Sequence, residues 1–112
     1  MSLNRKDPSE PTDVISVAEL VAFQAGAVVS RTLVKRPAGT VTAFAFDAGE
    51  GLSEHTAPYD ALVFSLEGEA EVSLSGTTHR LNVGELLKLP AGLPHAVKAI
   101  SPFKMLLIMI RA

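Results

Sequence analysis

The chain has 112 residues, enough for one domain with one hydrophobic core but too few for two cores of ordinary size. Ten Lys and Arg against twelve Asp and Glu give a net charge of -2, which leaves no basic excess to neutralise nucleic acid. The chain has no cysteine, no signal-peptide pattern and no apolar stretch of spanning length. These features favour a cytoplasmic protein that has no disulfide or thiolate metal site and binds neither nucleic acid nor membrane.

The N-terminal residues 1–12 are rich in charged residues and proline and contain little to bury. They are therefore expected to form a flexible arm ahead of a single domain over residues 13–112. Ser16 and Glu19 have the spacing of a capping box, which predicts one short helix that ends before Gly26. No later segment has the periodicity of a helix, so at most one short helix is expected.

The remainder of the chain consists of short β-branched and aromatic segments separated by turn-forming residues. A hairpin is predicted over residues 28–35 and 40–46, followed by strands over 61–66, 70–74, 77–83, 86–89, 95–100 and 103–110. This pattern indicates an all-β sandwich or barrel. The last of these strands is apolar on both faces, so its outer face needs cover from a second subunit, and we expect a homodimer.

Two glycine-punctuated blocks, residues 49–68 and 84–95, each supply one histidine, His55 and His95. In a chain with three histidines and no cysteine, this pair is the best candidate for binding chemistry. The third, His79, lies in a polar hairpin segment and is expected to face solvent. The alternative for His55 and His95 is that they only form hydrogen bonds inside the cavity, without binding a metal or taking part in catalysis.

The two blocks resemble the paired motifs of the cupins, commonly written G-x5-H-x-H-x3-4-E-x6-G and G-x5-P-x-G-x2-H-x3-N. Seven positions match at the family's spacing: Gly49, His55 and Gly68 in the first motif and Gly84, Pro90, Gly92 and His95 in the second. The resemblance implies a small, single-domain RmlC-like cupin. It therefore implies a jelly-roll, or double-stranded β-helix, barrel with its site inside.

Three positions depart from the motifs, where Ala57 replaces the second histidine, Ala61 the glutamate and Ala99 the final asparagine. Cupin metal centres resemble a site of three histidines and one carboxylate, so two of the expected ligands are absent. The resemblance then implies an incomplete site. His55 and His95 would hold a divalent ion, whether Zn, Fe, Mn or Ni, only if other oxygen ligands or waters completed its shell.

Four more residues are candidates for the site. Ser65 shares strand parity with Ala61, whose family counterpart points inward, and is expected to line the pocket. Tyr59 is a candidate for the cavity mouth and Met109 for an adaptable cavity wall. Asp60 is a candidate catalytic carboxylate, although strand alternation turns it to the opposite face unless a bulge just before it changes its direction.

These features leave several functions open. The first is binding of a small-molecule ligand inside the barrel, with or without a divalent metal. The second is a metal-independent isomerase or epimerase, in which a histidine removes a proton beside a carbonyl and Asp60 or Glu54 orients that histidine. The third is a metal-dependent dioxygenase-type cupin, and the fourth is a sensory or structural dimer. The scaffold carries many chemistries, so the sequence decides neither the ligand nor the pathway.

Overall fold

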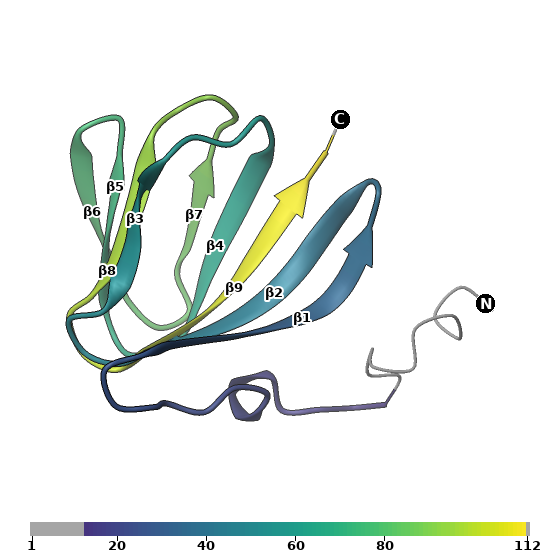
Figure 1. The fold of residues 1–112 in the computed structure, drawn as a ribbon, viewed down its shortest axis with the longest axis vertical. Coiled ribbons are helices and arrows are strands. Elements are labelled where there is room, and N and C mark those ends of the chain that lie inside the picture. Colours follow the sequence, from purple (N-terminus) through teal and green to yellow (C-terminus); the bar gives the residue numbers. More distant parts are fainter. Residues whose placement is uncertain (1–12, 112) are drawn as a thin grey trace.

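The computed structural model describes residues 13–111, which are almost entirely β-strand (Figure 1). In chain order the strands are β1 (Val28–Arg36), β2 (Gly39–Phe46), β3 (Gly51–His55), β4 (Asp60–Glu67), β5 (Ala70–Leu74), β6 (Thr77–Leu81), β7 (Leu86–Leu89), β8 (His95–Ala99) and β9 (Phe103–Ile110). The only helical element in this range is a 3-10 turn, η2 (Val17–Glu19), so no helix there is long and apolar enough to cross a membrane. The all-β prediction is confirmed.

Local patterns located most of these strands. The predicted β1–β2 hairpin forms, and β5, β7 and β9 have the predicted bounds. The predicted capping box does not form, because the Ser16 side chain makes no cap hydrogen bond and the Ser16 carbonyl accepts the Glu19 N–H instead, at 3.0 Å. Strand β3 was not among the predicted strands. The predicted arm over residues 1–12 lies outside the described residues.

The strands form two antiparallel sheets that face each other as the two walls of a barrel (Figure 1). The large sheet has the order β1-β2-β9-β4-β7 and the small sheet the order β3-β8-β5-β6. Neighbours far apart in sequence, such as β2 with β9 and β3 with β8, are typical of a jelly roll. We call the end where loops 56–59 and 90–94 meet the last residues of β9 the open end, and the opposite end the closed end.

The hydrophobic core fills the closed end of the barrel. Alternation along the strands points Phe46, Phe103 and Met105 inward, and all three are completely buried. The rings of Phe46 and Phe103 lie with centroids 5.7 Å apart. Toward the open end the inward side chains pack against this core but keep partial exposure, as Leu107 and Met109 do on β9. The barrel is therefore tightly packed at one end only.

The outer face of the large sheet shows the same division. Near the closed end, the segment after η2 places Val21 and Phe23 against a second apolar cluster with Ala43 and Ala45. Lys104 fixes this cover, because its ammonium donates to the Ala18 carbonyl at 2.6 Å and lies 4.8 Å from the Phe23 ring centroid. Near the open end, the outward-facing apolar residues of this sheet are only half-buried or are exposed: Val34, Val41, Ile108 and Ile110.

Candidate functional site

The two motif histidines lie side by side on neighbouring strands. His55 ends β3 and His95 begins β8, and the two are direct partners in the antiparallel register. Their rings meet edge to face, with centroids 4.4 Å apart and planes at 68°. The structure therefore brings together the pair that the sequence singled out, from positions forty residues apart in number.

A β-bulge aims His55 at its partner. Leu52 pairs with Val97 and His55 with His95, so three steps along β3 match two steps along β8. In a regular strand His55 would point to the face opposite Leu52, which packs on the core. The extra residue at Ser53–Glu54 reverses this direction, so the imidazole lies on the same inner face as Leu52. No bulge was predicted here, since Ser53 and Glu54 give no β signal.

Both imidazoles are held in the same way by the backbone. Nδ1 of His55 lies 2.8 Å from the Ser53 carbonyl oxygen, and Nδ1 of His95 lies 3.2 Å from that of Leu93. A carbonyl oxygen can only accept, so each Nδ1 must carry the proton. In the neutral ring this leaves the lone pair on Nε2. The site therefore offers two oriented nitrogen acceptors, the tautomer that metal-binding histidines also use.

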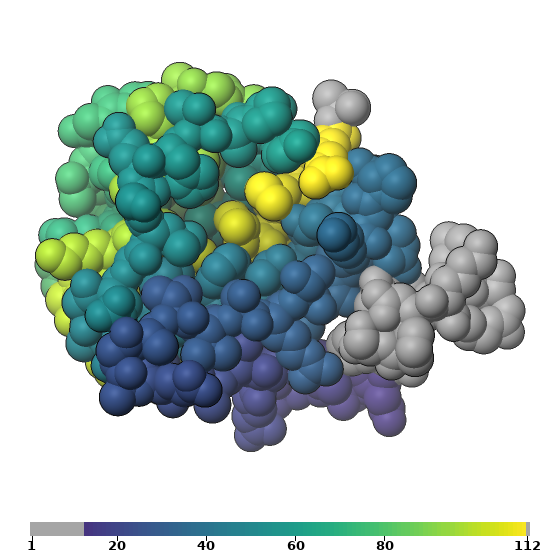
Figure 2. Space-filling model, in the orientation of Figure 1, coloured from purple at the N-terminus to yellow at the C-terminus, as the bar shows by residue number. Residues whose placement is uncertain are grey.

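The pair sits at the open end of the barrel. His95 is 8% exposed, whereas His55 is exposed. The Gly92 N–H donates to the Ala57 carbonyl at 2.8 Å and ties together the loops that carry the two histidines. Gly92 has a φ of 80°, which favours glycine over other residues at this turn. In Figure 2 a hollow opens between the teal surface of β3 and its loop and the blue surface of β1 and β2, with yellow β9 at its floor.

The described residues do not fit a complete metal centre. Within residues 13–111 no group of three or more His, Cys, Asp or Glu is arranged to hold an ion. The family's two other ligand positions are alanines, of which Ala61 is buried against the core and Ala57 is half-buried. A methyl group cannot coordinate a metal. The chain thus supplies two nitrogen donors, and any further ligand would have to come from water or from a bound molecule.

Asp60, the candidate catalytic carboxylate, faces away from the histidines. It pairs with Ile110, whose side chain lies on the outer face of the large sheet, and its Oδ1 accepts the Ala91 N–H at 2.9 Å. This bond fixes the loop before His95, so Asp60 supports the site from outside. Glu54 is exposed at the bulge. Among the described residues, neither histidine has an ion pair with a carboxylate.

The other predicted site residues lie on the inner face of the large sheet. Met109 is half-buried near the open end, and Ser65 is 1% exposed near the closed end. The Ser65 hydroxyl has no hydrogen-bond partner among residues 13–111. Tyr59 is half-buried in the loop after His55, and its ring lies 4.7 Å from the Arg111 guanidinium carbon. The sequence-based prediction missed Arg111, although Arg111 lies two residues after Met109 and would share its face of an extended strand.

His79 does not face solvent as predicted. It pairs with Val72, which is completely buried, so its side chain takes the inner face of the small sheet and is half-buried. The polar neighbours that suggested exposure, Thr78 and Arg80, occupy the alternate, outer face. His79 lines a cavity of about 380 Å³ between the edge strands β6 and β7, with Arg80, Leu81, Glu85, Leu86 and Leu87.

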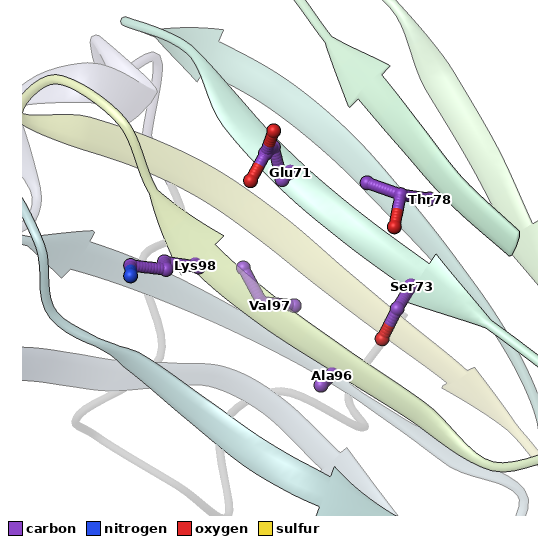
Figure 3. Close-up of a pocket in the computed structure, with 6 residues that line it drawn as sticks. All are labelled: Glu71, Ser73, Thr78, Ala96, Val97 and Lys98. Atoms are coloured by element: carbon purple, nitrogen blue, oxygen red, sulfur yellow. The ribbon is translucent and has the colours of Figure 1, made fainter. Parts of the chain in front are cut away.

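A separate groove lies on the outer face of the small sheet (Figure 3). It has a volume of about 140 Å³ and is lined by Glu71, Ser73, Thr78, Ala96, Val97 and Lys98. Glu71 and Lys98 are register partners, yet they form no ion pair. Neither motif histidine lines this groove, so it is distinct from the histidine site.

Comparisons with known proteins agree on the family. Residues 43–110 match the family model described as a cupin domain. A conserved Streptococcus pyogenes protein of unknown function is 35% identical, with a TM-score of 0.87 over 92% of this chain and 90% of that one. A cupin superfamily protein from Desulfitobacterium hafniense is 27% identical, with a TM-score of 0.86 over 91% and 94%.

A third solved structure, a cupin 2 conserved barrel domain protein from Leptotrichia buccalis, is 43% identical. Its TM-score is 0.82 over 84% of this chain and 46% of that one. No curated protein matches the chain. The similarity to these three structures covers 84–92% of this chain, and none of their names states an activity.

Proposed function

Because this chain belongs to the cupin family, we propose that it binds a small organic molecule at the open end of its barrel, through Nε2 of His55 and of His95. The observation that supports this is the matched pair of Nδ1 hydrogen bonds to backbone carbonyls, which leaves both Nε2 atoms as acceptors. Half-buried Leu107 and Met109 on the facing sheet suit an apolar part of the ligand.

The pair can accept two hydrogen bonds from one ligand. The rings are already fixed by the backbone and by each other, so binding costs little additional side-chain entropy. A ligand with a hydroxyl or amine donor at one end and an apolar body would satisfy both the nitrogen atoms and the half-buried interior. Each such hydrogen bond contributes about 1 kcal/mol.

A second candidate is binding through a divalent metal ion. The free Nε2 atoms of His55 and His95 favour it, since imidazole nitrogen suits Zn, Fe and Ni. Two donors do not make a resident centre, so the ligand's own oxygen atoms or waters would have to complete the shell. Metal would then bind tightly only together with the ligand.

The enzyme alternatives have less support. The isomerase hypothesis pairs a histidine with the carboxylate of Asp60 or Glu54. The Asp60 carboxylate accepts the Ala91 N–H instead, and neither histidine has an ion pair with a carboxylate of the described residues. A dioxygenase-type centre needs more ligands than the described residues provide. Both stay predictions from the family resemblance. The cytoplasmic location stays a prediction too, supported by the absence of cysteine.

Fragment screening by NMR tests this proposal, with the methyl signal of Met109 and the ring signals of His95 as reporters. We expect the screen to find ligands that shift these signals, and we expect His55→Gln and His95→Gln to weaken the binding of those ligands. His79→Gln is the matched control, because His79 lines a different cavity. Ligands that act only on signals of β6 and β7, or that bind both variants as they bind the wild type, would refute the proposal. Metal titration of the same proteins tests the second candidate.

A further inference from the structure

The end of the last strand carries a cation that the sequence analysis did not use. In the β4–β9 register Ala61 pairs with Met109 and Asp60 with Ile110. Continuing it by one step pairs Tyr59 with Arg111, and the guanidinium carbon does lie 4.7 Å from the Tyr59 ring centroid. Arg111 therefore extends the inner face of the large sheet, one rung beyond Met109 toward the open end.

The guanidinium of Arg111 has no anionic partner among residues 13–111. Its Nε is buried without a hydrogen-bond partner, and the side chain makes no ion pair with a carboxylate of residues 13–111. The adjacent carboxylate of Asp60 lies on the outer face and accepts the Ala91 N–H. An unpaired guanidinium donor at a partly buried site is costly unless something satisfies it. Stacking on Tyr59 orients the group without using its N–H donors.

A second polar atom on the same face is also unsatisfied. Thr40 on β2 is the register partner of Met109 on β9, and its hydroxyl is buried without a hydrogen-bond partner in the described part of the chain. The Arg111 N–H donates to the Ala38 carbonyl at 2.8 Å, which places the start of β2 and the end of β9 together. Two donors without acceptors, Arg111 Nε and Thr40 Oγ1, thus occupy adjacent positions at the open end.

We propose that Arg111, with Thr40 and Tyr59, forms a subsite at the open end of the barrel that binds the carboxylate of a small organic acid. The planar guanidinium presents paired N–H donors that match the two oxygen atoms of a carboxylate. The half-buried side chain of Met109 lies on the next rung and suits the apolar part of such an acid. This inference rests on the proposed function, because it names the ligand class of the same open end.

Benzoate and its neutral analogue benzamide test whether the subsite prefers a negatively charged ligand. They have similar shape, so a difference between them reports on the anion site. We expect benzoate to shift the Met109 methyl signal at millimolar concentration and to bind about tenfold more tightly than benzamide, since hydrogen bonds to a charged acceptor are stronger than those to a neutral one. Equal binding of the two, or no benzoate binding, would overturn the proposal.

Variants locate the site. Arg111→Gln should lower the affinity for benzoate about tenfold and leave the affinity for benzamide unchanged. Arg111→Lys should restore part of the affinity for benzoate, because it keeps the positive charge but lacks the paired N–H donors of the planar guanidinium. Arg31→Gln, an exposed position with the same charge change, is the control and should bind benzoate as the wild type does. Thr40→Val should lower the affinity for benzoate by a smaller factor, about fivefold. Wild-type affinity for benzoate in folded Arg111→Gln would overturn the proposal.

Three outcomes separate this inference from the function on which it rests. If benzoate and benzamide bind equally and both depend on His95, the barrel binds small molecules but the carboxylate subsite is wrong. If inorganic phosphate binds in an Arg111-dependent way while benzoate does not, the anion class is wrong. If fragments shift only signals outside the barrel, the proposed function itself fails, whatever Arg111 does.

Discussion

The closed and open ends of the barrel are built from the same strands but packed in opposite ways. At the closed end, Phe46 and Phe103 are completely buried inside, and Val21 covers the outer face of the large sheet. At the open end, Met109 is only half-buried inside, and Ile110 is 53% exposed outside. Hydrophobic stabilisation follows buried apolar area, so the closed end carries most of it.

The packed end leaves the other end of this small domain free to carry function. The closed end supplies the rigidity that holds the sheets together, and the open end can then keep polar and half-buried side chains at little cost to the fold. His55, His95, Tyr59 and Arg111 all belong to the open end.

Two phenylalanines on β2 give the most direct test. Phe46 and Phe44 both point inward, and their rings stack with centroids 5.8 Å apart. Phe46 is completely buried at the closed end, whereas Phe44 is half-buried. We expect Phe46→Ala to lower the free energy of unfolding by about 3–5 kcal/mol and Phe44→Ala by about 1–2 kcal/mol, measured by denaturant titration. Equal losses would show that the packing does not loosen along β2 away from the closed end.

The exposed apolar outer face at the open end predicts a homodimer. Val41, Ile108 and Ile110 lie there without cover from residues 13–111, and a second copy would bury them. Light scattering should give twice the chain mass of 11.8 kDa. Ile108→Glu should return the single-chain mass, because a carboxylate would be buried at the interface. Val83→Glu, at a position 62% exposed between β6 and β7, should leave the mass unchanged. A soluble wild-type monomer would contradict the prediction.

A substitution of Ser65 tests whether water or a ligand reaches the packed part of the barrel. Its hydroxyl is 1% exposed and has no partner, so it costs stability. We expect Ser65→Ala to raise the free energy of unfolding by about 1 kcal/mol. The half-buried Ser73, on the outer face of the small sheet, is the control, and Ser73→Ala should change stability by less than about 0.5 kcal/mol. A loss of stability in Ser65→Ala would mean that a water or ligand satisfies the hydroxyl and that the cavity reaches this depth.

The histidines should contribute least to stability. His55→Ala removes an exposed side chain, and the expected change is within about 0.5 kcal/mol. His95→Ala removes a buried ring and its hydrogen bond to the Leu93 carbonyl, at a cost of about 1 kcal/mol. Circular dichroism should show both variants folded, while the ligand-induced shift of the Met109 signal is lost. If either variant unfolds, the pair has a structural role instead of a binding role.

Much of the fold follows from local patterns. Glycine and proline mark the turns, and short β-branched runs mark the strands, so β5, β7 and β9 have their predicted bounds. The two motif blocks identified His55 and His95 as a pair, and alternation from Ala61 predicted that Ser65 points inward, as it does. These features depend on residues close in sequence, which is why the sequence alone determined them.

Other features depend on which strands pair and in which register, so they are visible only in the folded structure. The bulge in β3 exists because β8 lies beside it, and without it His55 would point away from His95. His79 turns inward because its partner on β5 is buried Val72. Arg111 reaches Tyr59 only through the alignment of β4 with β9. Register joins residues far apart in the chain, and a one-residue shift exchanges the two faces of a strand, so local sequence cannot fix which side chains meet.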